Sequence, residues 1–211
     1  MNLTPQIIAA GTGCTLLRAS QWLDPMQAAC DKYEINTPLR MSAFLATYGV
    51  ESQYLTALSE DMYYTATRLM AIFPREFPNQ ALASQYAGQP EKLANFVYAN
   101  RNGNGDVASG DGWAFRARGA GLTGRTLYQL IVMAIDLDVI AHPELLEQPE
   151  NAAMASAWCW ANRNMNKLAD AGNFLGISKA WNLGNANNPG TPVGWPQRRS
   201  LYAAAKSAFG I

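Results

Sequence analysis

Residues 37–60 read TPLRMSAFLATYGVESQYLTALSE, and this stretch holds the pattern that decides the fold. Thr37 followed by Pro38 is a typical helix start, because threonine caps the first turn and proline suits the first helical position. We expect a helix over residues 42–54. Its apolar face is formed at spacings i, i+4, i+7 and i+11 by Phe44, Tyr48, Glu51 and Leu55.

Glu51 is the carboxylate on that apolar face, so burial is expected to raise its pKa toward the range of a general acid. Glu60 follows nine residues later, about two and a half helical turns, and cannot share the face of a continuous helix. A break near Leu58 and Ser59 would fold Glu60 back, in a more polar strand or loop, across a cleft from Glu51. Two carboxyl groups in different environments suit acid/base hydrolysis of glycosides. The alternative is one half-buried and one surface glutamate without chemistry.

The rest of the chain predicts a mainly α fold with little or no β structure. Thr4-Pro5 and Asp24-Pro25 repeat the signature of a cap followed by proline. Further helices are expected at residues 63–73, 79–86, 90–98, 125–141, 149–161 and 196–209. We expect one catalytic domain over residues 1–211, with a smaller helical lobe around residues 65–110.

Composition narrows the possible functions. Hydrophobic residues make up 49% of the chain and the formal net charge is zero, so nothing favours nucleic acid as a partner. Two short basic clusters are of the kind that serves loops and surface ion pairs, namely Arg116, Arg118 and Arg125, and Arg198 with Arg199. Three scattered cysteines form no disulfide framework and indicate a reducing compartment. The sequence shows no signal peptide and no membrane span, so synthesis in the cytoplasm is expected.

One loop, residues 100–113, imitates a calcium loop at Asn102, Asn104 and Asp106. Val107 and Trp113 stand where that motif needs glycine and glutamate, so no metal and no cofactor is expected. Tryptophans in polar loops can stack on sugar rings or simply pack within the protein. The tryptophans in such loops are Trp113, Trp181 and Trp195.

Several motifs, taken in order, resemble glycoside hydrolase family 19. They are Tyr48-Gly-Val-Glu-Ser52, Leu58-Ser-Glu-Asp-Met-Tyr-Tyr-Thr-Ala66, Tyr98-Ala-Asn-Arg-Asn-Gly-Asn-Gly-Asp106, Ser109-Gly-Asp-Gly-Trp113, Phe115-Arg-Ala-Arg-Gly119, Leu122-Thr-Gly-Arg125 and Trp181-Asn-Leu-Gly184. The resemblance covers roughly residues 35–205. It implies a bilobal, lysozyme-like, helical architecture and hydrolysis with inversion, for which the two carboxyl groups stand about 6.5–9.5 Å apart.

The resemblance also implies the roles of individual residues. Glu51 would be the general acid, Glu60 the general base, and Thr123 the hydroxyl residue that helps position the attacking water. The residues expected to bind substrate are Tyr64, Trp113, Arg118 and Asn182. The sequence departs from the family pattern at three places. Val50 stands where histidine is common, and segment 118–123 is one residue shorter and lacks a glutamine. Residues 181–184 read Trp-Asn-Leu-Gly in place of the more typical Ile-Asn-Gly-Gly. These departures concern substrate contacts more than the acid and base.

We therefore expect an endolysin-type muramidase that cleaves β-1,4 bonds of peptidoglycan. The resemblance to phage lysis enzymes implies a monomer that waits in the host bacterial cytoplasm until a holin opens the inner membrane and gives it access to the cell wall. One alternative is a chitinase that hydrolyses N-acetylglucosamine polymers. Another is a non-catalytic peptidoglycan-binding phage protein that retains the fold.

Overall fold

The computed structural model describes all 211 residues, and its ordered elements are helices. The α-helices of the first part are α1 (Pro5–Thr12), α2 (Leu16–Gln21), α3 (Leu23–Lys32), α4 (Pro38–Glu51), α5 (Ala66–Ile72), α6 (Gln80–Ser84) and α7 (Pro90–Val97). Those of the second part are α8 (Asp111–Ala114), α9 (Arg125–Ile135), α10 (Pro149–Asn162), α11 (Met165–Asp170), α12 (Phe174–Leu183) and α13 (Trp195–Ala208). Two 3₁₀ helices are η1 (Val107–Ser109) and η2 (Pro143–Glu147). The mainly α fold expected from the sequence is confirmed.

The chain divides into two compact units. The first unit comprises Met1–Leu58 and Leu146–Ile211, and the second comprises Ser59–Leu145. Residues 65–110, where a smaller lobe was expected, fall within the second unit. No helix combines the length and apolar character that crossing a lipid bilayer would need.

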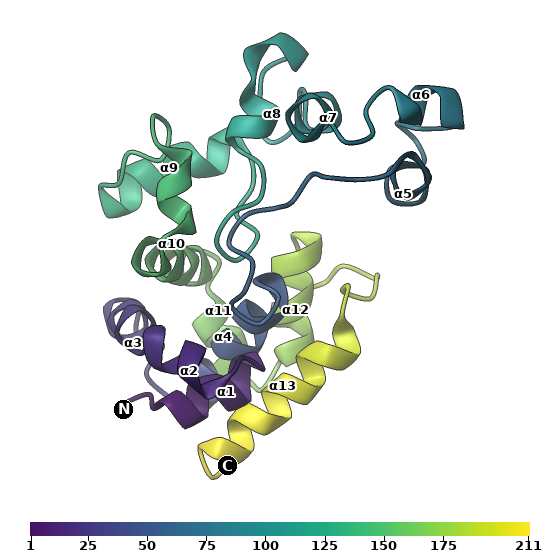
Figure 1. The fold of residues 1–211 in the computed structure, drawn as a ribbon. Helices are drawn as coiled ribbons and strands as arrows, with labels where there is room; N and C mark the ends of the chain where they lie inside the picture. Colours follow the sequence, from purple (N-terminus) through teal and green to yellow (C-terminus); the bar gives the residue numbers. More distant parts are fainter. The chain divides into compact units, whose positions relative to one another are not determined.

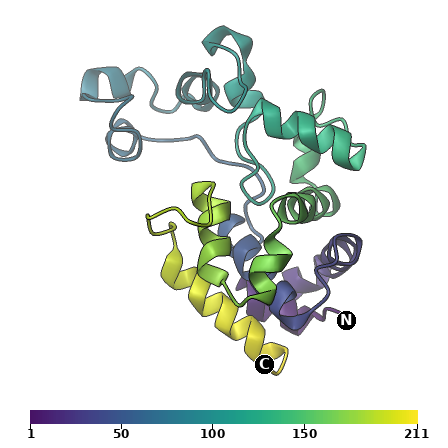
Figure 2. The ribbon, with the colours of Figure 1, turned by 180° about the vertical axis from the view of Figure 1, so that it is seen from behind.

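In the first unit, α4 is the central helix, and its residues from Met41 to Gly49 are all buried. Helices α1, α11, α12 and α13 pack around it (Figure 1). Figure 2 shows α13 (yellow) along the outer side of this group, with α12 (yellow-green) beside its first half. A Cβ atom on Gly49 would lie 2.5 Å from the carbonyl oxygen of Thr12, so glycine is what lets α1 and α4 approach this closely.

The second unit contains its own apolar cluster. Its buried members come from the segments around α5, α6 and α7, and they are Met62, Ala66, Leu69, Phe77, Ala83, Leu93, Ala94 and Val97. Aromatic rings pack against this cluster, for example Tyr86 against Phe96 with ring centroids 4.7 Å apart. Because α5, α6 and α7 are short, this shared cluster supplies the packing that stabilises them.

The helix starts agree with the capping signals. The side chains of Thr4 and Thr37 accept hydrogen bonds from the first turns of α1 and α4, and proline follows each of them. Asp24 was expected to cap a helix but lies in the first turn of α3, which begins at Leu23. A carboxylate in a first turn is still favourable, because it faces the positive end of the helix dipole.

Two helix ends differ from expectation. Helix α4 ends at Glu51, where the hydroxyl of Ser52 donates to the Tyr48 carbonyl and accepts from the N–H of Leu55. The three residues after Ser52 have φ between 49° and 63°, so the chain leaves the helix before the expected break at 58–59. Helix α9 ends at Ile135 rather than near residue 141, because Asp136 adopts the left-handed conformation that terminates helices.

Candidate active site

Glu51 is the last residue of α4, and its partner is an arginine from α13. The Nη2 atom of Arg198 donates to Oε1 of Glu51 in an ion pair that joins residues 147 positions apart in sequence. Arg198 is only 1% exposed and the Glu51 side chain 17% exposed, so the pair is largely removed from water. The cluster of Arg198 was expected to serve loops and surface ion pairs, and the ion pair that Arg198 forms is buried rather than on the surface.

The same arginine connects Glu51 to Asn182. The Nε atom of Arg198 donates to the Val193 carbonyl oxygen at 2.9 Å, and the Val193 N–H donates to Oδ1 of Asn182 at 2.8 Å. Nη1 of Arg198 is buried without a hydrogen-bond partner, so Glu51 and Val193 supply the interactions of its guanidinium. Asn182 sits in the last turn of α12, and this network holds the 182–193 loop against the base of α13.

Glu60 lies in the second unit, on a short segment paired through its backbone. Ser59 and Arg118 form an antiparallel bridge, and Arg118 forms another with Leu122. The N–H of Glu60 donates to the Ala117 carbonyl at 2.9 Å. Thr123 directly follows Leu122, so these pairings bring the segments of Glu60 and Thr123 onto one small ribbon. This agrees with the expectation that any β structure is at most a short ribbon.

The carboxylate of Glu60 is half-buried, and a tyrosine holds it. The Tyr98 hydroxyl lies 2.9 Å from Oε1 and 2.8 Å from Oε2 of Glu60, so its single proton is shared between the two oxygens. Burial raises the pKa of Glu60 above its usual range. The hydrogen bonds from Tyr98 and with the Ala117 backbone, and the positive charge of Arg116, oppose that rise. Burial and the Glu60 charge raise the pKa of Tyr98, which therefore stays protonated as the donor.

An arginine and a tryptophan complete the surroundings of Glu60. Arg116 donates from Nε to the Glu60 carbonyl oxygen at 3.3 Å and from Nη2 to the Ser59 hydroxyl at 3.0 Å. Its guanidinium stacks 3.6 Å from the ring centroid of Trp113, which is half-buried. Trp113 is thereby held near the segment that carries Glu60. Tyr64 also lies in the surroundings of Glu60. Burial raises the pKa of Tyr64 most, and the negative charge of Glu60 raises it further.

The two remaining predicted residues in the second unit lie on the same ribbon. The Thr123 hydroxyl donates to the Gly121 carbonyl oxygen at 3.1 Å, which leaves its lone pairs to accept a hydrogen bond. Arg118 is only 5% exposed, and its guanidinium donates to the Ala114 carbonyl and to the Tyr128 hydroxyl. These contacts give Arg118 a role in fixing the 114–128 segment. Its contact with substrate stays a prediction.

The segment 100–113 was expected to be one loop, but it contains η1 and most of α8, and polar side chains hold it in place. Asn104 accepts from the N–H of Arg125 and donates to the Tyr98 carbonyl. Asp111 pairs with Arg125 at 2.8 Å. No three histidine, cysteine, aspartate or glutamate side chains gather where they could hold a metal ion. The polar loop thus positions Tyr98, and through Tyr98 it positions Glu60.

Sequence reasoning named Glu51, Glu60, Thr123, Tyr64, Trp113, Arg118 and Asn182, of which Glu51 and Asn182 lie in the first unit and the others in the second. It placed none of Tyr98, Arg116 and Arg198 in the site, although Tyr98 and Arg116 fall within the quoted motifs. The helical fold, with two partly buried glutamates held by cationic and hydroxyl partners, fits the glycoside hydrolase class.

Comparison with known proteins identifies the family. Over 137 residues the chain is 33% identical to a glycosyl hydrolase family 19 domain-containing protein of Haemophilus influenzae. The matched stretch covers 64% of this chain and 68% of that relative. The chain belongs to glycoside hydrolase family 19. No protein-family model matches the chain.

Proposed function

We propose that this chain is an endolysin-type glycoside hydrolase that cleaves β-1,4 bonds of bacterial peptidoglycan with inversion. Glu51 is the general acid that protonates the leaving oxygen, and Glu60 is the general base that activates water. The observation that carries the proposal is the environment of Glu60. A carboxylate whose pKa is raised by burial is a stronger base than an exposed one, and Tyr98 keeps it oriented.

Thr123 fits the role of a second contact for the water. Its hydroxyl proton is donated to the Gly121 carbonyl oxygen, so the hydroxyl oxygen can act only as an acceptor for a further hydrogen bond. A water that donates one hydrogen to Thr123 and the other to Glu60 keeps a lone pair free for attack on the anomeric carbon. In this proposal the water loses a proton to Glu60 while the leaving sugar gains one from Glu51, so charge is conserved.

The proposal includes a cellular setting. The enzyme is made in the bacterial cytoplasm, acts as a monomer, and reaches the wall when a holin opens the inner membrane. Cys14, Cys30 and Cys159 are all free thiols, which suits a reducing compartment. Burial raises the pKa values of the Cys30 and Cys159 thiols to about 12, so both stay protonated and unreactive.

The test is digestion of purified, outer-membrane-free sacculi, with the released muropeptides identified by mass spectrometry. We expect products with N-acetylmuramic acid at the reducing end. Glu51→Gln and Glu60→Gln should each lower turnover by about a hundred-fold or more. Thr123→Ala should lower it less, because the water keeps its contact with Glu60. Glu91→Gln, an exposed glutamate on α7, is the matched control and should retain wild-type turnover.

Other outcomes separate the alternatives. Reducing N-acetylglucosamine ends would keep the glycosidase and change the bond that is cut. Cleavage of chitin oligomers without cleavage of sacculi would make the protein a chitinase, an activity that the family also contains. Wild-type turnover in the folded Glu51→Gln protein would refute the acid assignment. Binding of sacculi without any cleavage would favour the non-catalytic protein.

A further inference from the structure

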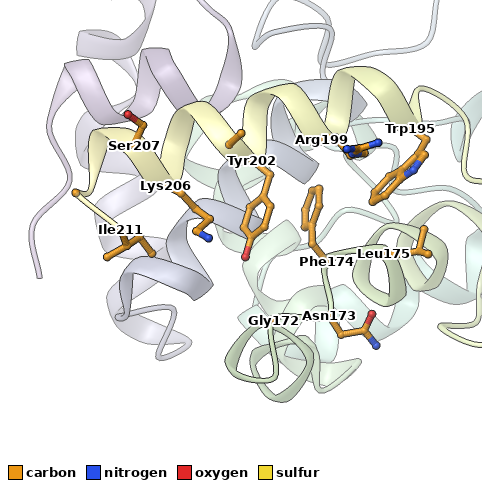
Figure 3. Close-up of a pocket in the computed structure, with 12 residues that line it drawn as sticks. Gly172, Asn173, Phe174, Leu175, Trp195, Arg199, Tyr202, Lys206, Ser207 and Ile211 are labelled. Atoms are coloured by element: carbon orange, nitrogen blue, oxygen red, sulfur yellow. The ribbon is translucent and has the colours of Figure 1, made fainter.

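A cavity of about 830 Å³ lies in the first unit, between the start of α12 and the exposed face of α13 (Figure 3). Its wall includes Asn173 and Phe174 from the start of α12, together with Trp195, Arg199, Tyr202 and Lys206 from α13. A cavity of this volume is in the range of small-molecule and sugar sites. None of the roles assigned to the glutamates uses these residues.

Helical geometry separates this cavity from the surroundings of Glu51. Trp195, Arg199, Tyr202 and Lys206 are spaced i, i+4, i+7 and i+11, so they share one face of α13. Arg198 points about a quarter turn away from that face, into the interior of the unit, where it meets Glu51. One helix therefore turns the partner of the predicted acid toward the interior of the unit and lines the cavity with the adjacent face.

Three aromatic rings form a stack along the cavity. Phe174 lies against Tyr202 with centroids 4.2 Å apart and planes 16° apart, and against Trp195 at 5.9 Å and 29°. Phe174, which contacts both other rings, is 5% exposed, whereas Tyr202 and Trp195 are half-buried. Figure 3 shows the three rings side by side, with Tyr202 and Trp195 flanking Phe174. The stacking covers both faces of Phe174, so the half-buried Tyr202 and Trp195 are the rings that can pack against the C–H face of a sugar.

The charged side chains on the wall of the cavity are both cationic. Arg199 and Lys206 are both on its wall, and no acidic side chain lines it. Neither cation has a carboxylate partner, and Lys206 lies 5.7 Å from the centroid of the Tyr202 ring. The side-chain oxygen of Asn173 caps α12 by accepting from Gly176, so the amide NH₂ of Asn173 remains a donor. Donors and cations together favour an anionic ligand.

We propose that this cavity is a second glycan-binding site, which takes a carboxylate-bearing segment of peptidoglycan. The inference rests on the proposed substrate, whose peptide-substituted sugars carry the sugar ring and the carboxylates that the aromatic stack and the two cations recognise. Chitin oligomers offer only the uncharged sugar. The site retains the enzyme on the cell wall without taking part in bond cleavage.

Binding to sacculi tests the proposal in the Glu51→Gln background, where cleavage does not interfere. The double substitution Arg199→Gln and Lys206→Gln removes both charges and keeps polar side chains at these positions. We expect it to weaken binding to purified sacculi about tenfold, a loss of about 1.4 kcal/mol. The matched control, Arg75→Gln with Lys167→Gln, removes two exposed cations elsewhere and should change binding less than twofold.

Two further measurements complete the test. Amidation of the sacculus carboxylates should weaken binding by the protein with an unsubstituted cavity to the level of the double variant. It should leave binding by the double variant unchanged. Turnover of short soluble glycan fragments by the active enzyme should be the same with and without the two cavity substitutions. Equal losses in the cavity and control variants, or no loss in either, would overturn the site. These two overturning outcomes are read from binding measurements alone, so they stay distinct from a failure of the proposed cleavage.

Discussion

Replacement of Arg198 by methionine probes the buried ion pair at the end of α4. Methionine has a similar length but no charge, so Glu51 loses its partner while remaining only 17% exposed. Removing one member of a buried pair costs about 3–5 kcal/mol, and the residual exposure of Glu51 puts the cost near the lower end. The Val193 carbonyl also loses a hydrogen bond, a further loss of about 1 kcal/mol.

These losses convert to a measurable change in melting temperature. For a chain of this length, 1 kcal/mol lowers Tm by about 2–4 °C, so a loss of 3 kcal/mol lowers it by about 6–12 °C. Tryptophan fluorescence is a suitable probe, since five of the six tryptophans lie in the first unit with Arg198. Thermal unfolding followed by fluorescence therefore reports on the unit that the substitution affects.

A double-mutant cycle separates the ion pair from simple loss of packing. Glu51→Gln alone leaves the buried guanidinium of Arg198 without a counter-charge, so we expect it to be destabilising too. The double variant has neither charge, and its loss should be smaller than the sum of the single losses by about 1 kcal/mol or more. Strictly additive losses, or a Tm change below about 2 °C in Arg198→Met, would refute the reasoning.

Two other predictions concern single contacts. Tyr98→Phe removes the hydrogen bond that opposes the raised pKa of Glu60, so that pKa should rise further. Because a general base acts only when deprotonated, the acidic limb of the pH profile of turnover should move to higher pH, and an unmoved limb would contradict the role of Tyr98. Gly49→Ala should lower the free energy of unfolding by about 1–3 kcal/mol, because the added methyl meets Thr12 backbone atoms at 2.5–2.6 Å. Urea unfolding measures this loss, and wild-type stability would show that α1 can shift freely.

The sequence predicted the helix starts better than the helix ends. A start such as Thr37-Pro38 is a local signal, since the cap and the first turn lie within four residues. The ends of α4 and α9 depend on residues in the left-handed conformation, such as Asp136. These residues are not glycines, so the usual sequence signal for a helix end is missing. Helix α12 was missed because its last turn, which contains Trp181 and Asn182, resembles a polar loop in sequence.

In the candidate site, too, the local features could be predicted from the sequence and the long-range contacts could not. Glu51 and Glu60 could be selected from the sequence, because their spacing and the surrounding motifs are local features. Their partners could not be selected, because Arg198 lies 147 residues from Glu51 and Tyr98 lies 38 residues from Glu60. Only tertiary packing brings such groups together, and no periodic pattern encodes the pairing.

The backbone pairing of Glu60 has a consequence for engineering. Its N–H is bound by the Ala117 carbonyl and its own carbonyl by Arg116, so main-chain atoms that nearly every amino acid possesses fix this position. The side chain at residue 60 can thus be exchanged without displacing the segment that carries it. Aspartate at residue 60 would bring the carboxylate one methylene closer to the backbone, while the backbone itself stays in place. In the second unit the backbone position of residue 60 is thus fixed independently of its side chain. Substitutions at residue 60 that change only side-chain length would therefore measure how far the carboxylate must extend for its chemistry.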